Sequence, residues 1–360
     1  MNLKFLVISL AIIALLVPES DAFWSRRRRR RRRRRPKPPP GPSQHCRNQV
    51  NLYSVIRGNN LHQLARVWAP AVKLAQGETW KPSSVDFFLR HVNVVGGPNP
   101  QPLRPNNLPT CNRNCYLKSK GRLNCASCTN LPFLHGEHPS KVPVYTTIVK
   151  KGSEIQFVYR FFFPYNRGKR VCVGLHGGGR CPCPKTPWGC PCPRIYCVGG
   201  YSTFGQHVGD WEHMKIVFRN NRLHSMFLST HNSAITNKHA GTFLWNGLTF
   251  QKGHKKLKLE GCTHGVAYAA LGSHGFWPNV GNHVYKNLPN GEKLVDKCSH
   301  GEAWNTWNTL KIVDQKPRGQ YTGDFKFLNF NGRWGNRERG CGLAKKVLNV
   351  CILEHGPQRS

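Results

Sequence analysis

The chain has few acidic residues, few methionines and no apolar run long enough to cross a bilayer. Only 16 of its 360 residues are Asp or Glu, against 54 Lys and Arg, so the formal net charge is +38 at pH 7. This imbalance excludes an acidic binding tail and makes anionic partners the expectation. The sequence also lacks an Asn-x-Ser/Thr acceptor, so N-glycosylation is not expected.

Aromatic and turn-forming residues are abundant instead. The 18 Phe, 10 Trp and 10 Tyr exclude a fully disordered chain, and the 35 Gly and 26 Pro favour turns and short strands over a helical bundle. We predict a mainly β fold over residues 46–360, an antiparallel β-sandwich with few short helices. The strand-like runs are residues 67–74, 85–95, 142–149, 155–163, 211–218, 223–228, 266–271 and 345–353, and residues 60–66 favour a helix.

The N-terminus is typical of a secretory signal peptide. Lys4 precedes a 13-residue apolar stretch, 5–17, and small residues at Ser20 and Ala22 suit signal peptidase. The alternative is a retained membrane anchor, but a spanning helix needs about 20 apolar residues. We therefore predict that residues 1–22 are removed and that the protein is secreted and extracellular.

Residues 23–45 are predicted to form a disordered Arg/Pro-rich arm, because like charges repel and prolines favour extended chain. The arginine side chain donates two parallel hydrogen bonds to phosphate, sulfate and carboxylate groups, so the arm is a candidate anion-binding segment. Removal by a basic-residue protease and a merely solvated charge tract are the alternatives. The candidate anion-binding residues are Arg26, Arg27, Arg28, Arg29, Arg30, Arg31, Arg32, Arg33, Arg34 and Arg35.

The rest of the chain is also strongly basic, which points to an extracellular polyanion as partner. Nucleic acid is not the expected partner, because no zinc-finger, helix-turn-helix or ribonucleoprotein signature is present and the chain is exported. Anionic glycans or anionic lipid head groups are the predicted partners. The sequence does not indicate an oligomeric state.

Fifteen cysteines agree with an oxidising compartment, and their odd number leaves at least one unpaired. Cysteine-rich stretches near 98–130 and 172–200 are predicted to be inserted loops stapled by disulfides. The first stretch has a spacing that could also form a four-thiolate zinc site, but secretion favours disulfides. Its cysteines are Cys111, Cys115, Cys125 and Cys128.

Two carboxylates are predicted on the buried face of one strand. Alternation places Asp210 and Glu212 on the same side as Met214 and Ile216. An unpaired carboxylate buried there costs several kcal/mol, so a cation or a specific hydrogen-bond set must offset it. His207 precedes the strand and can lend an imidazole. Such ligands suit a divalent cation, Ca²⁺, Mg²⁺, Mn²⁺ or Zn²⁺.

A second turn, residues 269–278, projects Ser273 and His274 from the end of a strand of small residues. We predict that His274 converges on the carboxylates and joins the metal site. A purely structural polar network and a hydrolytic centre are the alternatives. Adjacent residues on a strand point apart, so Ser273 and His274 make a weak nucleophile and base pair.

Three nearby residues have structural interpretations. Trp211 and His213 fall on the opposite strand face from the carboxylates, where packing is expected. Glu78 lies in a turn before Trp80, where it either caps the turn or adds a cation ligand.

Several ordered motifs across residues 65–340 resemble the vacuolar protein sorting-associated protein 62 family. They are residues 68–74, Glu78, Trp80, residues 82–89, 142–145, 162–166, 207–212, 268–275 and 332–335. The biochemistry of this family is obscure, so the resemblance implies little about activity.

Residues 207–212 are also similar, more distantly, to the GHRHDWE motif of the necrosis- and ethylene-inducing peptide-like proteins. Those proteins are β-sandwiches that place the motif's His, Asp and Glu around a divalent cation and engage sphingolipid head groups. Asp210 and Glu212 match the motif directly, and His207 matches with a shift in spacing at Gly209.

Together these features predict a secreted cationic β-sandwich that binds anionic glycans or lipid head groups and holds a divalent cation. A metal-dependent hydrolase of phosphate or glycosyl esters is the second hypothesis, although no complete set of acid, base and oxyanion donors is visible. A membrane-damaging effector is the third.

Overall fold

The structure is a computed structural model that describes residues 42–124, 129–172, 175–178, 195–198, 201–231, 239–288, 293–342, 351 and 353–358. These residues belong to one compact unit, Pro42–Ser360. The predicted signal peptide, nearly all of the arginine arm, most of the 172–200 insertion and most of the predicted strand 345–353 lie outside the described residues. Among the helices of the described residues, none has the length and apolar content to span a bilayer.

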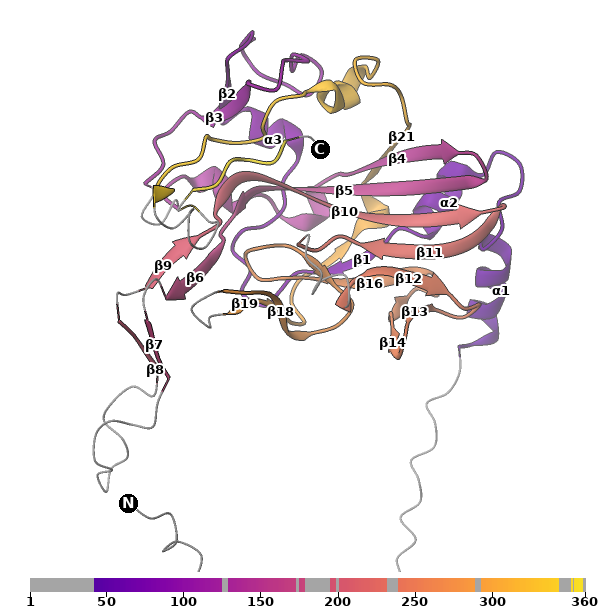
Figure 1. The fold of residues 1–360 in the computed structure, drawn as a ribbon. Coiled ribbons are helices and arrows are strands. Elements are labelled where there is room, and N and C mark those ends of the chain that lie inside the picture. The colour runs from indigo at the N-terminus through magenta and orange to yellow at the C-terminus, as the bar shows by residue number, and fades with distance from the viewer. Residues whose placement is uncertain are drawn as a thin grey trace, which may run out of the picture. The chain divides into compact units, whose positions relative to one another are not determined.

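The largest element is an eight-stranded sheet (Figure 1), in which only the pairing of β21 with β4 is parallel. Its long central strands, β10 and β5, pair along almost their whole length. In spatial order the strands are β14 (Lys255–Lys256), β13 (Phe250–Lys252), β12 (Gly241–Trp245), β11 (Arg222–Leu228), β10 (His207–Arg219), β5 (Glu154–Asn166), β4 (Val144–Lys151) and β21 (Leu310–Asp314).

A smaller sheet packs against one face of the large one. Its strands are β15 (Leu259–Glu260), β16 (His264–Ala269), β1 (Ala71–Lys73) and β20 (Ala303–Asn305), with β17 (Phe276–Trp277) paired to β16. β1 and β16 are parallel, and the other pairings are antiparallel. The predicted mainly β sandwich is therefore confirmed, with two parallel pairings that the sequence did not indicate.

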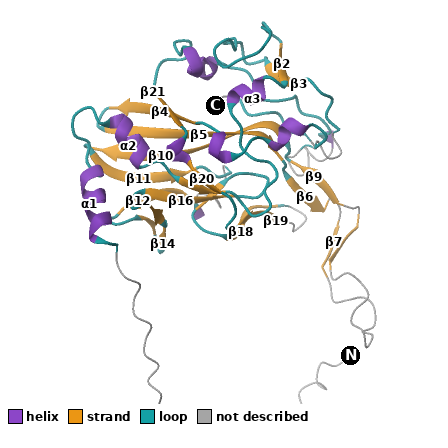
Figure 2. Ribbon diagram, turned by 180° about the vertical axis from the view of Figure 1, so that it is seen from behind, coloured by secondary structure: helices purple, strands orange, loops and turns teal. Residues whose placement is uncertain are grey.

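Four two-stranded pairs and a few helices surround the sandwich (Figure 2). The pairs are β2 (Val92–Val95) with β3 (Tyr116–Ser119), β6 (Lys169–Cys172) with β9 (Tyr201–Phe204), β7 (Leu175–Gly178) with β8 (Ile195–Val198), and β18 (Gly281–Asn287) with β19 (Lys293–Cys298). The α-helices are α1 (Gln44–Tyr53), α2 (Leu61–Val67) and α3 (Val85–Leu89), and the 3₁₀ turns are Pro132–His135, Pro139–Lys141, Thr306–Asn308 and Gly323–Asn329.

Strand β5 separates the two largest apolar clusters, because successive side chains of a strand point to opposite faces. Phe161 and Phe163 lie in the cluster between the two sheets, together with Trp304 of β20. Phe162 faces the other way, into a second cluster that includes Trp334. Both faces of the central sheet therefore carry apolar packing, and polar groups that lie within these clusters are withdrawn from water.

Two of the predicted strand runs were wrong at their starts, and for the first of them a helix-capping signal outweighs β-propensity. The run 85–95 begins with α3, where Ser84 accepts a hydrogen bond from the amide of Phe87, and only β2 is a strand. The run 67–74 contains the end of α2 and only the short β1. The predicted helix at 60–66 is confirmed by α2. Helix α1, which was not predicted, begins at Gln44, two residues inside the segment assigned to the arm.

Disulfides are present as predicted. Cys46 on α1 is bonded to Cys262, which follows β15, and Cys111 is bonded to Cys115 in the first cysteine-rich stretch. This bond excludes a four-thiolate zinc site at those cysteines, because its two sulfurs are not thiolates. Cys298 is free and buried among the described residues, in keeping with the odd cysteine count.

The two disulfides give a matched pair of stability predictions. Cys46 and Cys262 are separated by 216 residues, and Cys111 and Cys115 by only 4. A cross-link that closes a longer loop removes more entropy from the unfolded chain. We expect the Cys46→Ser/Cys262→Ser variant to lose about 4–5 kcal/mol of unfolding free energy, and the Cys111→Ser/Cys115→Ser variant to lose clearly less, both measured by urea denaturation. Equal losses would contradict this explanation.

Candidate functional site

The predicted acidic pair lies on the buried face of β10. Asp210 and Glu212 are both buried, and Met214 and Ile216 continue the same face into the apolar cluster between the sheets. Asp210 stands opposite Phe163 of β5, and Glu212 stands opposite Phe161. The alternation predicted from sequence is therefore confirmed.

Gly209 sets the position of Asp210. Its φ of +68° is in the left-handed region, and a Cβ at this position would lie 1.8 Å from the carbonyl oxygen of Trp334. Only glycine tolerates both the torsion and this backbone approach. The start of β10 is thereby locked against the segment that carries Trp334, which fixes the direction of the Asp210 side chain.

Asp210 is held by His274. The Nδ1 atom of His274 lies 2.9 Å from Asp210 Oδ2, and its Nε2 atom lies 2.9 Å from the carbonyl oxygen of Trp80. The imidazole is buried and stacks on Phe163 with ring centroids 3.8 Å apart. Both ring nitrogens are directed at acceptor oxygens of the protein. His274 therefore orients Asp210 and directs no lone pair at a cation.

His207 approaches the other oxygen of Asp210. Its Nε2 atom lies 3.9 Å from Asp210 Oδ1, and its Nδ1 atom lies 2.8 Å from the carbonyl oxygen of Gly209. Burial alone would raise the pKa of Asp210, but the hydrogen bond from His274 and the nearby His207 lower it below its ordinary value. Asp210 is accordingly an anion with one oxygen free of a close partner among the described residues.

Glu212 has the opposite electrostatic character. Burial raises its pKa well above the ordinary value, and the adjacent Asp210 raises it further, while a hydrogen bond with Ser229 partly offsets both effects. The two carboxylates thus repel each other in a low-dielectric environment. A protonated Glu212 or a bound cation resolves that repulsion.

A second buried charge cluster, which the sequence did not indicate, centres on Asp296 of β19. Its Oδ1 atom accepts hydrogen bonds from Ser273 Oγ at 2.6 Å and pairs with Lys169 Nζ at 2.9 Å. Its Oδ2 atom lies 2.8 Å from His231 Nε2 and from Trp277 Nε1. Burial would raise the pKa of Asp296, but His231, Lys169 and Ser273 hold it well below its usual range.

A cavity of about 240 Å³ lies beside these two clusters. His207 and Ser273 line it, so the residues next to Asp210 and those bonded to Asp296 share one space. Lys169, His231 and Tyr285 contribute further polar and aromatic surface. In ligand sites a small number of convergent polar groups fixes the orientation of the ligand, and this cavity offers such groups.

The other sequence predictions in this region are resolved by the contacts. Trp211 stacks on Phe327 and His213 on Phe227, so both pack as expected. Glu78 caps its turn, because its carboxylate accepts hydrogen bonds from the amides of Trp80 and Gly272. Ser273 and His274 have separate partners and do not form a nucleophile and base pair. The arginines 26–35 lie outside the described residues.

The residues that fit a cation are His207, Asp210 and Glu212. Two carboxylates and one imidazole suit a divalent ion, but no three of the four predicted ligand residues bring their ligand atoms within 4.8 Å of one another. Binding would therefore draw Glu212 and His207 towards Asp210 Oδ1. Asp296 and Lys169 were not identified from the sequence. Leu294, Asp296 and Cys298 nevertheless alternate as buried residues along β19, which is the same period-two pattern that identified Asp210.

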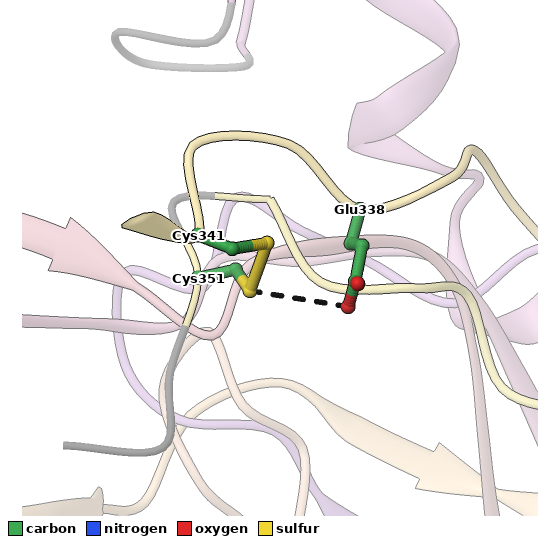
Figure 3. A group of neighbouring side chains, drawn as sticks. All are labelled: Glu338, Cys341 and Cys351. Atoms are coloured by element: carbon green, nitrogen blue, oxygen red, sulfur yellow. Dashed lines mark hydrogen bonds between the residues drawn. A yellow bond between two sulfur atoms is a disulfide. The ribbon is translucent and has the colours of Figure 1, made fainter. Parts of the chain in front are cut away.

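Among the described residues, the potential ligand atoms that do lie within 4.8 Å of one another belong to Glu338, Cys341 and Cys351 (Figure 3). Cys341 and Cys351 form a disulfide, and Cys351 Sγ lies 3.9 Å from Glu338 Oε2. A disulfide sulfur is not a thiolate, so this group holds no metal in its oxidised form.

Comparison with known proteins supports the motif resemblance. No family model matches the chain. It is 23% identical over 225 residues to the putative vacuolar protein sorting-associated protein TDA6 and 24% identical over 210 residues to vacuolar protein sorting-associated protein 62, both from Saccharomyces cerevisiae. The matches cover 58% and 56% of this chain but only 41% and 39% of those two proteins.

Two solved structures are also similar at low identity. One, titled "NLPPya in complex with mannosamine", is 11% identical with a TM-score of 0.33, covering 80% of this chain and 88% of that one. The other, titled "Toxin fold for microbial attack and plant defense", is 12% identical with a TM-score of 0.29, covering 76% and 81%. The resemblance to the vacuolar protein sorting-associated protein 62 family is confirmed as sequence similarity over more than half of this chain.

Proposed function

We propose that this chain is a secreted, cationic β-sandwich that binds an anionic glycan or lipid head group in the cavity beside β10. A divalent cation held by Asp210, Glu212 and His207 would bridge protein and head group. The main support for the proposal is the position of His207. Its side chain lines the cavity, and its Nε2 atom approaches Oδ1 of the buried, ionised Asp210. When bound, the cation would supply coordination to ligand hydroxyl or anionic oxygens.

The surroundings of the cavity support recognition rather than catalysis. Ser273 donates its hydroxyl hydrogen to Asp296, and Lys169, which donates to Ser273 at 2.9 Å, is itself paired with Asp296. A charged lysine paired with a carboxylate does not serve as a base. The described residues of this cavity therefore present donors and aromatic surface, without an activated nucleophile.

The test compares Asp210→Asn with Asp314→Asn, an exposed carboxylate on β21, after removal of ions with EDTA. We expect Ca²⁺ or Mn²⁺ to raise the affinity of the wild type and of Asp314→Asn for phosphatidylserine vesicles or a heparin hexasaccharide by about tenfold. Asp210→Asn should show no cation response. The readouts are sedimentation of vesicles and retention on heparin in 0.5 M salt.

Three results would contradict the proposal. Heparin retention that is unaffected by EDTA and by Asp210→Asn would show that the protein binds heparin through its net positive charge alone. Phosphodiesterase turnover that Asp210→Asn abolishes would establish the hydrolase instead. Dye release from the vesicles would establish a membrane-damaging effector.

A further inference from the structure

A basic cleft of about 290 Å³ adjoins the cavity of the candidate site. Among the described residues that line it, five are basic and none is acidic. The basic residues are Arg167, Lys169, Arg170, Lys293 and Lys297. The cleft and the cavity share Gly168 and Lys169 as lining residues, so Lys169 forms part of the boundary between them.

Only Lys169 among these five is neutralised within the described part of the chain, by its pairing with Asp296. Arg167 and the two lysines of β19, Lys293 and Lys297, are exposed and form no ion pair with a described carboxylate. Arg170 is also exposed, and its guanidinium lies over the ring of Tyr201 at 5.0 Å from the centroid. Four cations without an ion-pair partner among the described carboxylates therefore line one small cleft.

Like charges around one cleft repel one another, which raises the electrostatic energy of the empty cleft. A bound anion is attracted to each of them and lowers that energy. Arginine adds paired, planar donors that match the oxygens of phosphate and sulfate. The volume of the cleft accommodates a single tetrahedral oxyanion with part of an attached ring. The charge and the size together indicate one compact anionic group.

We propose that this cleft is an anion subsite that binds a phosphate or sulfate monoester. The inference rests on the proposed function in one respect: the ester would belong to a head group whose polar portion enters the adjoining cavity. Lys169 would then contact both parts of the ligand, because it borders both spaces. The subsite requires no cation, which separates it from the site at Asp210.

The test uses Arg167→Gln/Lys297→Gln, with Arg66→Gln/Lys118→Gln as a control that removes the same charge from exposed positions on α2 and β3. The probes are glucose 6-phosphate, glucose 6-sulfate and glucose, measured by isothermal titration calorimetry in 0.15 M salt. We expect the wild type to bind one or both esters at least tenfold more tightly than glucose. The cleft variant should lose about tenfold in ester affinity, and the control less than about twofold.

Near-ultraviolet circular dichroism checks that both double variants are folded. Equal affinity for glucose and the esters would overturn the inference, as would equal losses in the two variants. A heparin hexasaccharide that binds far more tightly than either ester and responds equally to both variants would also overturn it, because it would show diffuse polyanion binding. Ester binding should persist in EDTA and in Asp210→Asn, so failure of the subsite and failure of the cation site are observed separately.

Discussion

Replacing Gly209 with alanine is expected to abolish the accumulation of folded protein. The methyl group would lie 1.8 Å from the carbonyl oxygen of Trp334, and the adjoining Gly335 is locked in the same way, with a Cβ position 1.9 Å from the carbonyl oxygen of Val208. Both obstacles are backbone carbonyls, that of Val208 at the start of the central strand β10 and that of Trp334 in the segment packed against it, so neither can move aside as a flexible side chain would. We expect a loss of more than about 4 kcal/mol in unfolding free energy.

Gly253→Ala provides the control. Gly253 has a φ of +56°, but a Cβ there would meet nothing within 4 Å. This variant should show only the left-handed torsion penalty of about 1 kcal/mol. Expression yield and urea denaturation measure the two effects, and similar stabilities of the two variants would show that the contact with Trp334 is not restrictive.

Replacing Asp296 with asparagine is expected to cost about 3–5 kcal/mol of unfolding free energy. The four groups around this buried carboxylate, from Lys169, His231, Ser273 and Trp277, all face it as donors. An asparagine offers one acceptor oxygen and adds two hydrogens of its own, so Lys169 loses its counterion and donors meet donors. The measurement is urea denaturation at pH 7.

The control is Asp324→Asn, which removes the carboxylate from an exposed pair with Lys311. Exposed pairs contribute little, so its loss should stay below about 1 kcal/mol. If both variants lose the same amount, the buried cluster does not hold this part of the chain together.

The stability difference between wild type and Asp296→Asn should depend on pH in one direction. The pKa of Asp296 is lowered in the folded state, so its ionisation stabilises the fold fully above the unfolded pKa of about 3.9. That contribution is lost as the pH falls towards the folded pKa. The part of the difference that comes from ionised Asp296 should therefore shrink below about pH 4. A difference that stays constant down to pH 3 would indicate that Asp296 is not ionised in the folded state.

Patterns local to one strand or turn were visible in the sequence. Period-two alternation placed Asp210 and Glu212 on the buried face of β10, and the small residues before His274 marked the strand that delivers it. The capping of α3 by Ser84 is also a local signal. It was overlooked because the Val and Phe residues that follow Ser84 favour strands. Local patterns therefore predicted the acidic pair correctly but left helix α3 as a strand.

Partnerships between distant segments were not visible. Lys169 and Asp296 meet only because β6 lies close to β19, and this proximity is set by the folded topology. His274 was predicted to ligate a metal, but its second nitrogen faces the carbonyl of Trp80, which no sequence spacing reveals. Sequence therefore identified the residues near Asp210 more reliably than their individual roles.

The most direct test of the cation site is the metal content of the purified protein, measured by inductively coupled plasma mass spectrometry beside a Glu212→Gln variant. Two carboxylates buried side by side should retain about one divalent ion per chain in the wild type, and Glu212→Gln should lose it while keeping a native circular dichroism spectrum. A folded wild type that binds no divalent ion, even after dialysis against Ca²⁺, Mg²⁺, Mn²⁺ and Zn²⁺, would contradict the account and leave Asp210, His274 and Glu212 as a structural polar network.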